Sequence, residues 1–308
     1  MPSDFEIAFF HSVFSIRCIR AVGNAWEEFV GEGMSAKYGA DFLQVDASGR
    51  GDKGCDGYVN GLMLACYGAT SPSESYVAQK ITGDYAKAAL HWGTEMETWA
   101  FVHNNANGLP TLAARKMMEM RRASLPHVIE HWPPQVLWDN VFAELERAKL
   151  VRILGIPPSD RPAEMSYIAQ CVKALSRTRM IEDLDDVQPV PVGKLEYNNF
   201  EPSTVDLITE AKNHTHHVRY YFRQATPGEQ FQVSENLRMR YDGLTARLES
   251  ADEVFHHLCD DLIAEADFEE SMVDQEQQRS AAILVVTHFF ESCLLFEMPE
   301  EGDHATAV

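Results

Sequence analysis

The chain has 308 residues, more than the roughly 100–200 residues of a single domain, so its length favours two domains. Hydrophobic residues make up 45% and charged residues 24%, as in an ordinary globular protein. The net charge is −21, and residues 200–308 hold seven Lys and Arg against twenty-two Asp and Glu. The C-terminal part is therefore a poor surface for the phosphate backbone of nucleic acids.

The cysteines and the N-terminus indicate an intracellular protein. Six cysteines occur without a CxxC pair, which is typical of reduced, buried thiols in the cytosol. No basic segment followed by an apolar run opens the chain, and no window of about 18 apolar residues occurs. We therefore expect a cytoplasmic protein with no signal peptide and no membrane span.

The first 133 residues alternate between helical and extended patterns. Residues 4–38 predict one long helix or a helix pair from their apolar spacing. Asn60-Gly61 predicts a two-residue hairpin, because both central positions of a type I′ turn need positive φ. The elements that follow from these patterns are strands at 42–45, before the hairpin turn, 62–67, 99–103 and 128–132, and helices at 73–92 and 111–123.

The order of these elements predicts the fold class. Helix, three strands, helix, strand, helix, strand matches the αβββαβ core of the restriction-endonuclease-like (PD-(D/E)XK) fold, with a mixed sheet. We predict an α+β protein with this domain over residues 1–133 and an all-helical C-terminal part. The remaining segments are expected to be a helical extension (134–182), a linker (183–202), a helical docking bundle (203–298) and a loose acidic tail (299–308). Within the helical part, helices are expected at 134–148, 163–179, 203–224, 229–249, 252–266 and 275–296.

Nucleases of this fold hold Mg²⁺ with carboxylates, and the chain has candidates for that role. Asp56 and Asp52 precede the hairpin and are the expected metal ligands, with Glu28 on the first helix in support. The third strand, however, reads Ala65-Cys66-Tyr67 where an acid and a lysine are needed. Lys80 on the next helix is the candidate replacement lysine. The alternative is that both aspartates are turn residues, favoured beside glycine.

Histidines mark two further places. His103 ends a predicted strand before the loop 104–110, where it could act as a base or ligand, although a polar strand exit is the plainer interpretation. Two clusters on predicted helices, 214–217 and 256–259, have i, i+3 spacing that could bind zinc, whereas helix-surface histidines are the simpler interpretation. An apolar stripe near Phe289, Phe290 and Phe296 could anchor a partner or form bundle core.

Several motifs resemble one family. They are the stretches 51–58 (GDKGCDGY), 64–69 (LACYGA), 99–104 (WAFVHN), 108–110 (GLP) and 289–297 (FFESCLLFE), together with Lys80 and Asp84. Together they are similar to the non-ATPase proteins of ABC-three-component conflict systems, relatives of the Lamassu antiphage systems. The chain departs from the family pattern at Cys55, where Asn is usual, and at Ala65, where Gln is usual.

The resemblance implies a role in bacterial defence against phage or plasmid DNA. Such proteins look like partners of an SMC- or Rad50-like ABC ATPase and a small third component, in a hetero-oligomer that DNA could reach through the N-terminal domain. Two hypotheses follow. Either the N-terminal domain is degenerate and the chain is an adaptor, or it is an active Mg²⁺-dependent DNA endonuclease that uses Asp56, Asp52, Lys80, Glu28 and His103.

Overall fold

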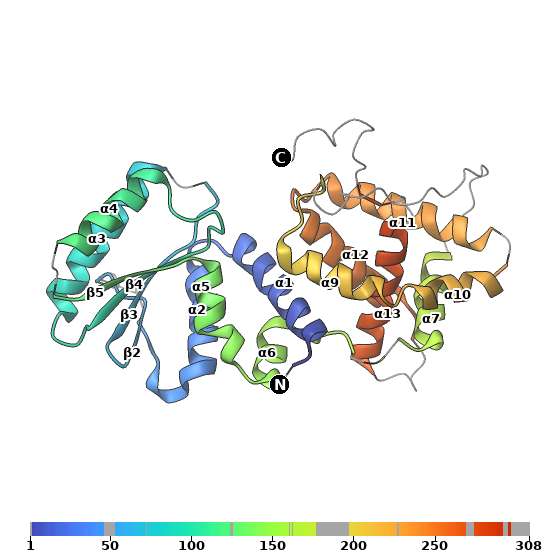
Figure 1. The fold of residues 1–308 in the computed structure, drawn as a ribbon, viewed down its shortest axis with the longest axis horizontal. Coiled ribbons are helices and arrows are strands. Elements are labelled where there is room, and N and C mark those ends of the chain that lie inside the picture. The colour runs from blue at the N-terminus through green and yellow to red at the C-terminus, as the bar shows by residue number, and fades with distance from the viewer. Residues whose placement is uncertain are drawn as a thin grey trace. The chain divides into compact units, whose positions relative to one another are not determined.

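The computed structural model describes residues 2–45, 53–71, 73–123, 126–159, 161, 163–176, 197–226, 228–268, 274–291 and 295–296. The chain divides into two compact units (Figure 1). The α/β unit is Phe14–Ile153, and the helical unit combines Met1–Val13 with Leu154–Val308. The chain passes from one unit to the other inside helix α1 (Asp4–Arg20) and again at the last residue of α6 (Arg147–Leu154).

A five-stranded mixed sheet organises the α/β unit. The strands lie in the order β1-β2-β3-β4-β5, with antiparallel β1–β2 and β2–β3 pairs and parallel β3–β4 and β4–β5 pairs. Their bounds are β1 (Leu43–Gln44), β2 (Gly57–Val59), β3 (Leu62–Tyr67), β4 (Thr98–His103) and β5 (Val128–Trp132). The predicted α+β fold class is therefore confirmed.

The hairpin between β2 and β3 forms at the predicted turn. Asn60 and Gly61 have φ of 46° and 83°, so both take the left-handed conformation that the type I′ turn requires. Val59 pairs with Leu62, which leaves a loop of two residues. The turn fixes the register of β3, because a shift of one residue would move every side chain to the opposite face.

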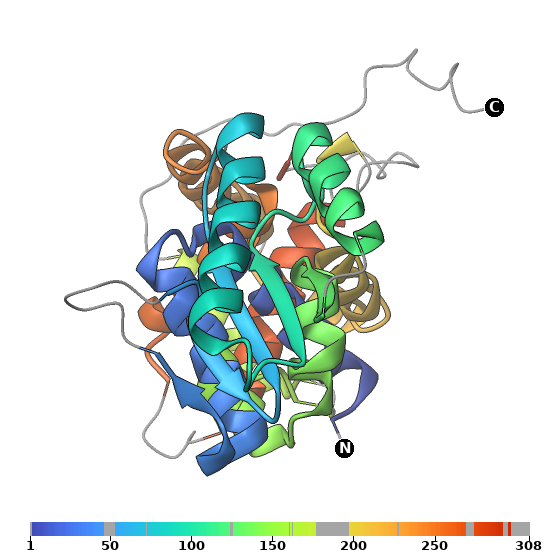
Figure 2. The same ribbon diagram turned by 90° about the vertical axis from the view of Figure 1, so that its left-hand side faces the viewer.

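Helices cover both faces of the sheet. The α/β unit contains α2 (Asn24–Tyr38), α3 (Glu74–Trp92), α4 (Thr111–Arg122), α5 (Pro134–Asn140), α6 (Arg147–Leu154) and the 3-10 helices η1 (Gly39–Asp41) and η2 (Phe142–Glu144). α3 and α4 lie side by side on one face (Figure 2). Met63 and Ala65 of β3 pack into the core on that face, together with Trp99 of β4. Because side chains alternate along a strand, Leu64 and Cys66 point to the opposite face, toward α2.

One predicted helix, 134–148, is wrong. The chain leaves helical geometry at Val141, whose φ and ψ are −128° and −65°, and continues as η2 and α6. The break turns the fully buried Phe142 ring onto Phe14 and Phe29, at centroid distances of 4.8 and 5.2 Å. Burial of this aromatic ring outweighs the cost of interrupting the helix.

The helical unit is built around its last helix. The first turns of α1 belong to this unit. Its other elements are the helices α7 (Met165–Ser176), α9 (Pro202–Lys212), α10 (His216–Gln224), α11 (Glu229–Thr245), α12 (Ala251–Glu265) and α13 (Gln275–Glu291). α13 packs against α7, α9, α10 and α12, and its residues from Ser280 to Phe290 are all buried. Phe289, Phe290 and Phe296 therefore form bundle core, and the idea that they form an exposed anchor is wrong.

Two other expectations for the helical part have defined outcomes. The helix expected at 203–224 is interrupted at Asn213–Thr215, where the Thr215 hydroxyl bonds to Glu291 at the end of α13. The linker expected at 183–202 lies largely outside the described residues, which resume at Tyr197. None of the described helices combines the length and the apolar composition that a membrane span requires.

Candidate functional site

Asp56 lies immediately before β2 and binds the neighbouring strands through its backbone and its side chain. Its backbone carbonyl accepts from the Val45 N–H at 3.0 Å, and its N–H donates to the Leu64 carbonyl at 2.8 Å. The carboxylate Oδ2 accepts from the backbone N–H of Cys66 at 2.6 Å. This short bond to a charged acceptor ties the start of β2 to β3.

The third strand presents no carboxylate beside Asp56. Ala65 and Cys66 are buried on opposite faces of the sheet. Burial and the nearby charges of Asp56 and Glu27 raise the pKa of the Cys66 thiol well above its usual range. The thiol is therefore protonated, and only the thiolate would be a metal ligand or nucleophile.

Lys80 lies on α3, the helix that covers the opposite face from Cys66. Its ammonium Nζ is 2.7 Å from Asp84 Oδ2, one turn along the same helix, and 5.8 Å from the ring centroid of Tyr67. Asp84 also binds Lys87 at 3.1 Å. The positive charge of Lys80 is thus matched by a carboxylate of its own helix.

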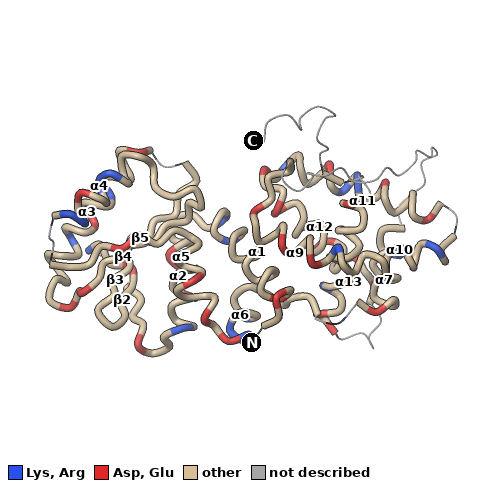
Figure 3. The backbone as a smooth tube through the Cα atoms, in the orientation of Figure 1, with Lys and Arg blue, Asp and Glu red and all other residues tan. Residues whose placement is uncertain are grey.

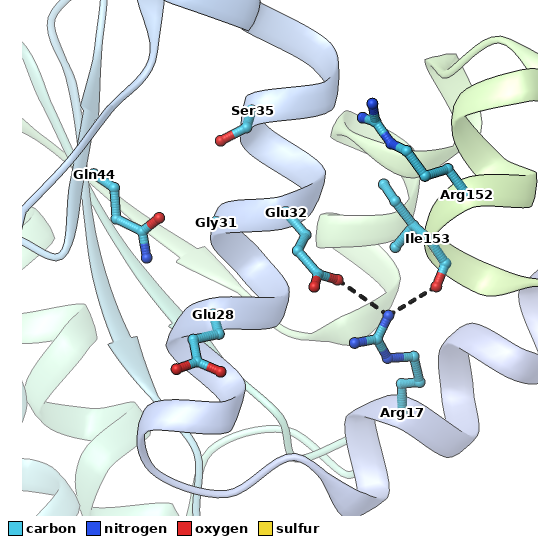
Figure 4. A pocket seen from close by; sticks show the side chains of 8 residues that line it. All are labelled: Arg17, Glu28, Gly31, Glu32, Ser35, Gln44, Arg152 and Ile153. Atoms are coloured by element: carbon cyan, nitrogen blue, oxygen red, sulfur yellow. Dashed lines mark hydrogen bonds and ion pairs between the residues drawn. The ribbon is translucent and has the colours of Figure 1, made fainter.

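Glu28 lines a cavity of about 570 Å³ in the α/β unit (Figure 4). Arg17 binds Glu32 there at 3.1 Å and donates to the Ile153 carbonyl at 2.8 Å. Glu28 is exposed, whereas the adjacent Glu27 is half-buried and close enough to raise the pKa of Cys66. The charge of Glu27, not that of Glu28, therefore acts on the third strand. Helical spacing in the sequence does not show which of these two neighbouring glutamates faces the sheet.

His103 ends β4, where its buried ring pairs with the half-buried ring of His131 on β5. The His103 Nδ1 accepts from the Asn105 N–H at 3.2 Å, so the ring proton is on Nε2 and is donated to His131 Nε2, 2.6 Å away. Burial, with His131 nearby, lowers the pKa of His103 to about 3. His103 is therefore a neutral residue that orders the loop after β4. Its partner could have been found from the sequence, since both histidines lie near the ends of adjacent predicted strands.

The fit of these groups to Mg²⁺ depends on how many carboxylates meet. Among the residues that the structure describes, no three carboxylate, imidazole or thiol groups come together as a metal site. Asp52 lies outside the described residues. Asp56 is accordingly the only expected ligand whose position is known, and its Oδ2 already accepts a backbone bond. A single carboxylate does not make a magnesium site without further ligands.

The helix histidines have local partners. His256 Nε2 lies 2.7 Å from the buried Ser12 hydroxyl, which is also 2.7 Å from the Thr204 hydroxyl. These bonds join α1, α12 and α9 inside the helical unit. His216 accompanies His214 and His217 on and before α10, and its ring bonds to the Asn213 carbonyl.

Comparison with known proteins matches one region. Residues 168–297 match the family model of C-terminal domain 10 of the ABC-three component systems. The matched segment begins within α7 and extends beyond α13, so it covers most of the helical unit. The chain matches no curated protein and no solved structure.

Proposed function

We propose that this chain, which carries the C-terminal domain of an ABC-three-component system, is a non-catalytic adaptor of a defence complex. The match to that domain confirms the resemblance seen in the sequence. The helical unit attaches the chain to the other components, namely an SMC- or Rad50-like ABC ATPase and a small third protein. The α/β unit keeps a nuclease-like sheet without nuclease chemistry.

The bond from the Cys66 N–H to the Asp56 carboxylate carries this proposal. In a nuclease of this fold, the strand that follows the hairpin supplies the second carboxylate and the lysine. Here the same strand supplies a protonated thiol, a methyl group and a backbone donor that binds Asp56 itself. Asp56 thus has a structural use that needs no metal.

Lys80 supports the same proposal. A lysine that migrates to a neighbouring helix can serve a nuclease only if its ammonium reaches the phosphate. The Lys80 ammonium is bound by Asp84, which is only about one-tenth exposed, and it lies over Tyr67. Moving it to a phosphate would break this ion pair and leave the buried carboxylate with Lys87 as its one remaining cation among the described residues.

A DNA-cleavage assay tests the adaptor role. The purified complex of this chain with its ATPase and third component is incubated with supercoiled plasmid, ATP and Mg²⁺, and a complex with Asp56→Asn runs in parallel. We expect equal nicking by both complexes, at the level of a sample without this chain. Cleavage by the wild-type complex that Asp56→Asn abolishes would overturn the adaptor role.

The second candidate is an active Mg²⁺-dependent endonuclease. One observation favours it: the charges of Asp56 and Glu27 both act on Cys66, so two carboxylates from different elements approach the third strand. Asp52 would complete the ligand set, and Lys80 would neutralise the phosphate. Activity in the assay above, lost in both Asp56→Asn and Lys80→Ala but kept in Lys116→Ala, would establish this function.

Assembly is the second property that an adaptor must show. ATPase and third component are co-expressed with and without this chain and separated by size-exclusion chromatography. We expect the ATPase and the third component to elute together only when this chain is present. Co-elution of the two other components in its absence, with unchanged stoichiometry, would show that this chain does not hold the complex together.

A further inference from the structure

We propose that the cavity along helix α2 binds a short peptide through the two charged ends of that peptide. The cavity has a volume of about 570 Å³, within the range of about 300–1,000 Å³ that small-molecule sites occupy. All of its lining residues belong to the α/β unit, and neither Asp56 nor Lys80 is among them. The proposed site is therefore independent of the adaptor role.

One face of α2 forms the floor of the cavity. Four lining residues share this face, since they follow at i, i+3, i+4 and i+7: Glu28, Gly31, Glu32 and Ser35 (Figure 4). With a rise of about 1.5 Å per residue, the floor is about 10.5 Å long. Three extended residues of a peptide span about 10 Å, so a tripeptide reaches from one end of the floor to the other.

A glycine keeps the middle of the floor open. Gly31 is buried, and a methyl group in place of its hydrogen would lie 3.0 Å from the amide of Gln44, closer than an ordinary contact. Gln44 lies on the edge strand β1, and its amide points toward the cavity (Figure 4). This amide offers both a donor and an acceptor, which are the groups that a peptide bond in the middle of the ligand requires.

Arg17 is held in place at the side of the cavity. Its guanidinium lies 4.3 Å from the ring centroid of Phe29, and its Nη1 donates to Glu32 at 3.1 Å and to the Ile153 carbonyl at 2.8 Å. Both hydrogen bonds use this single nitrogen, and the other terminal nitrogen points away from the two acceptors (Figure 4). The charges of Arg17 and Glu32 therefore cancel, while Arg17 keeps a donor for an oxygen of the ligand.

The two other charges of the lining lie toward opposite ends of the floor. Glu28 is two turns from Ser35 along α2, and the guanidinium of Arg152 lies at the level of Ser35 (Figure 4). Both charged side chains are exposed, and neither forms an ion pair with a residue that the structure describes. One acid and one base at separate ends complement a ligand whose own charges are separated in the same way.

Other classes of ligand fit this lining less well. None of the eight lining residues is aromatic, so a nucleobase would find no ring on which to stack. A phosphate would meet the like charges of Glu28 and Glu32, and a metal ion would meet one free carboxylate beside Arg152. A peptide with its ammonium at Glu28 and its carboxylate at Arg152 matches both free charges of the lining.

Calorimetric titration of the full-length chain with triglycine tests the site. Triglycine has both charged ends and no side chains, so its binding reports on the backbone and the termini alone. We expect a dissociation constant of about 1 mM or below. N-acetyl-triglycine lacks the ammonium and triglycine amide lacks the carboxylate, so each should bind about fivefold or more weakly.

Variants assign each charged end of the peptide to one residue. Glu28→Gln should bind triglycine and its N-acetyl form equally, because the acid that recognises the ammonium is gone. Arg152→Gln should bind triglycine and its amide equally, for the corresponding reason. Arg122→Gln is the control, since Arg122 is an exposed arginine among the basic positions of α4 and lies outside the cavity (Figure 3). Circular dichroism confirms that each variant is folded.

Three results would overturn the peptide site. One is the absence of binding by wild-type protein at a triglycine concentration of about 10 mM, ten times the expected dissociation constant. Another is equal binding of triglycine and both capped forms, which would show that the two charges do not select the ligand. The third is tighter binding of inorganic phosphate than of triglycine, lost in Arg152→Gln, which would assign the cavity to a phosphate-bearing ligand. The ATPase and the third component take no part in these titrations, so failure here leaves the adaptor role unaffected.

Discussion

The hydrogen bond between Asp56 and Cys66 makes a prediction that separates a structural aspartate from a catalytic one. In Asp56→Ala the buried Cys66 N–H loses its 2.6 Å partner. Leaving a donor of this kind unsatisfied costs about 1.5–3 kcal/mol when the lost acceptor is charged. Asp56→Asn keeps an amide oxygen in the same place, so only the charge-dependent part of the bond is lost, about 1 kcal/mol or less.

Urea denaturation followed by tryptophan fluorescence measures this difference in the right part of the molecule. All five tryptophans lie between residues 26 and 138, within the α/β unit, so the signal reports the unfolding of that unit. With a slope of about 2 kcal/mol per molar urea, a loss of about 2 kcal/mol lowers the midpoint by about 1 M. We expect this shift for Asp56→Ala and less than about half of it for Asp56→Asn.

Two outcomes would contradict the structural assignment. If both substitutions lowered the free energy of unfolding equally, the amide oxygen in Asp56→Asn would not replace the carboxylate as acceptor for the Cys66 N–H, and the loss could not be assigned to this hydrogen bond. A stabilised Asp56→Ala variant would point to an aspartate retained for function at a cost in stability, beside the like charge of Glu27.

Three further predictions concern protonation, thiols and the helical core. The pKa of His103 is about 3 in the folded unit and near 6.5 in the unfolded chain, so between these pH values the unfolded chain binds the proton more tightly. The free energy of unfolding should therefore fall by up to about 1.4 kcal/mol for each pH unit below about pH 6, and by less in His103→Gln. Urea titrations at pH 7 and pH 5 measure this difference. Five of the six cysteines are buried, and Cys293 lies outside the described residues. Native protein should therefore release at most one equivalent of thiol to Ellman's reagent and denatured protein six; rapid release of two or more from the native protein would contradict the burial. Phe290→Ala should lower the free energy of unfolding of the helical unit by about 3–5 kcal/mol, because it leaves a cavity in the core. Tyr220→Ala, at an exposed position, should change that free energy by less than about 0.5 kcal/mol. Thermal unfolding followed by circular dichroism measures both, and equal effects would refute the central place of α13.

The local pattern of the sequence determined much of the α/β unit. Asn60-Gly61 specified the hairpin because few residues tolerate positive φ at both positions. Strand 128–132 and helix 111–122 followed from apolar spacing and flanking loops, and the order of elements was enough to predict the mixed sheet. The family resemblance likewise rested on short motifs, and the match over residues 168–297 confirmed it.

Only the tertiary structure decided which side chains meet. The sequence places Asp56 before a strand but cannot say that its carboxylate binds the Cys66 N–H, because that bond depends on the register of β2 and β3. The break at Val141 arises from the burial of Phe142, a long-range effect that overrides helical spacing. The unbroken pattern of α1 gives no sign that residues 1–13 belong to the helical unit, since that assignment is made by the residues they pack against, such as Thr204 and His256.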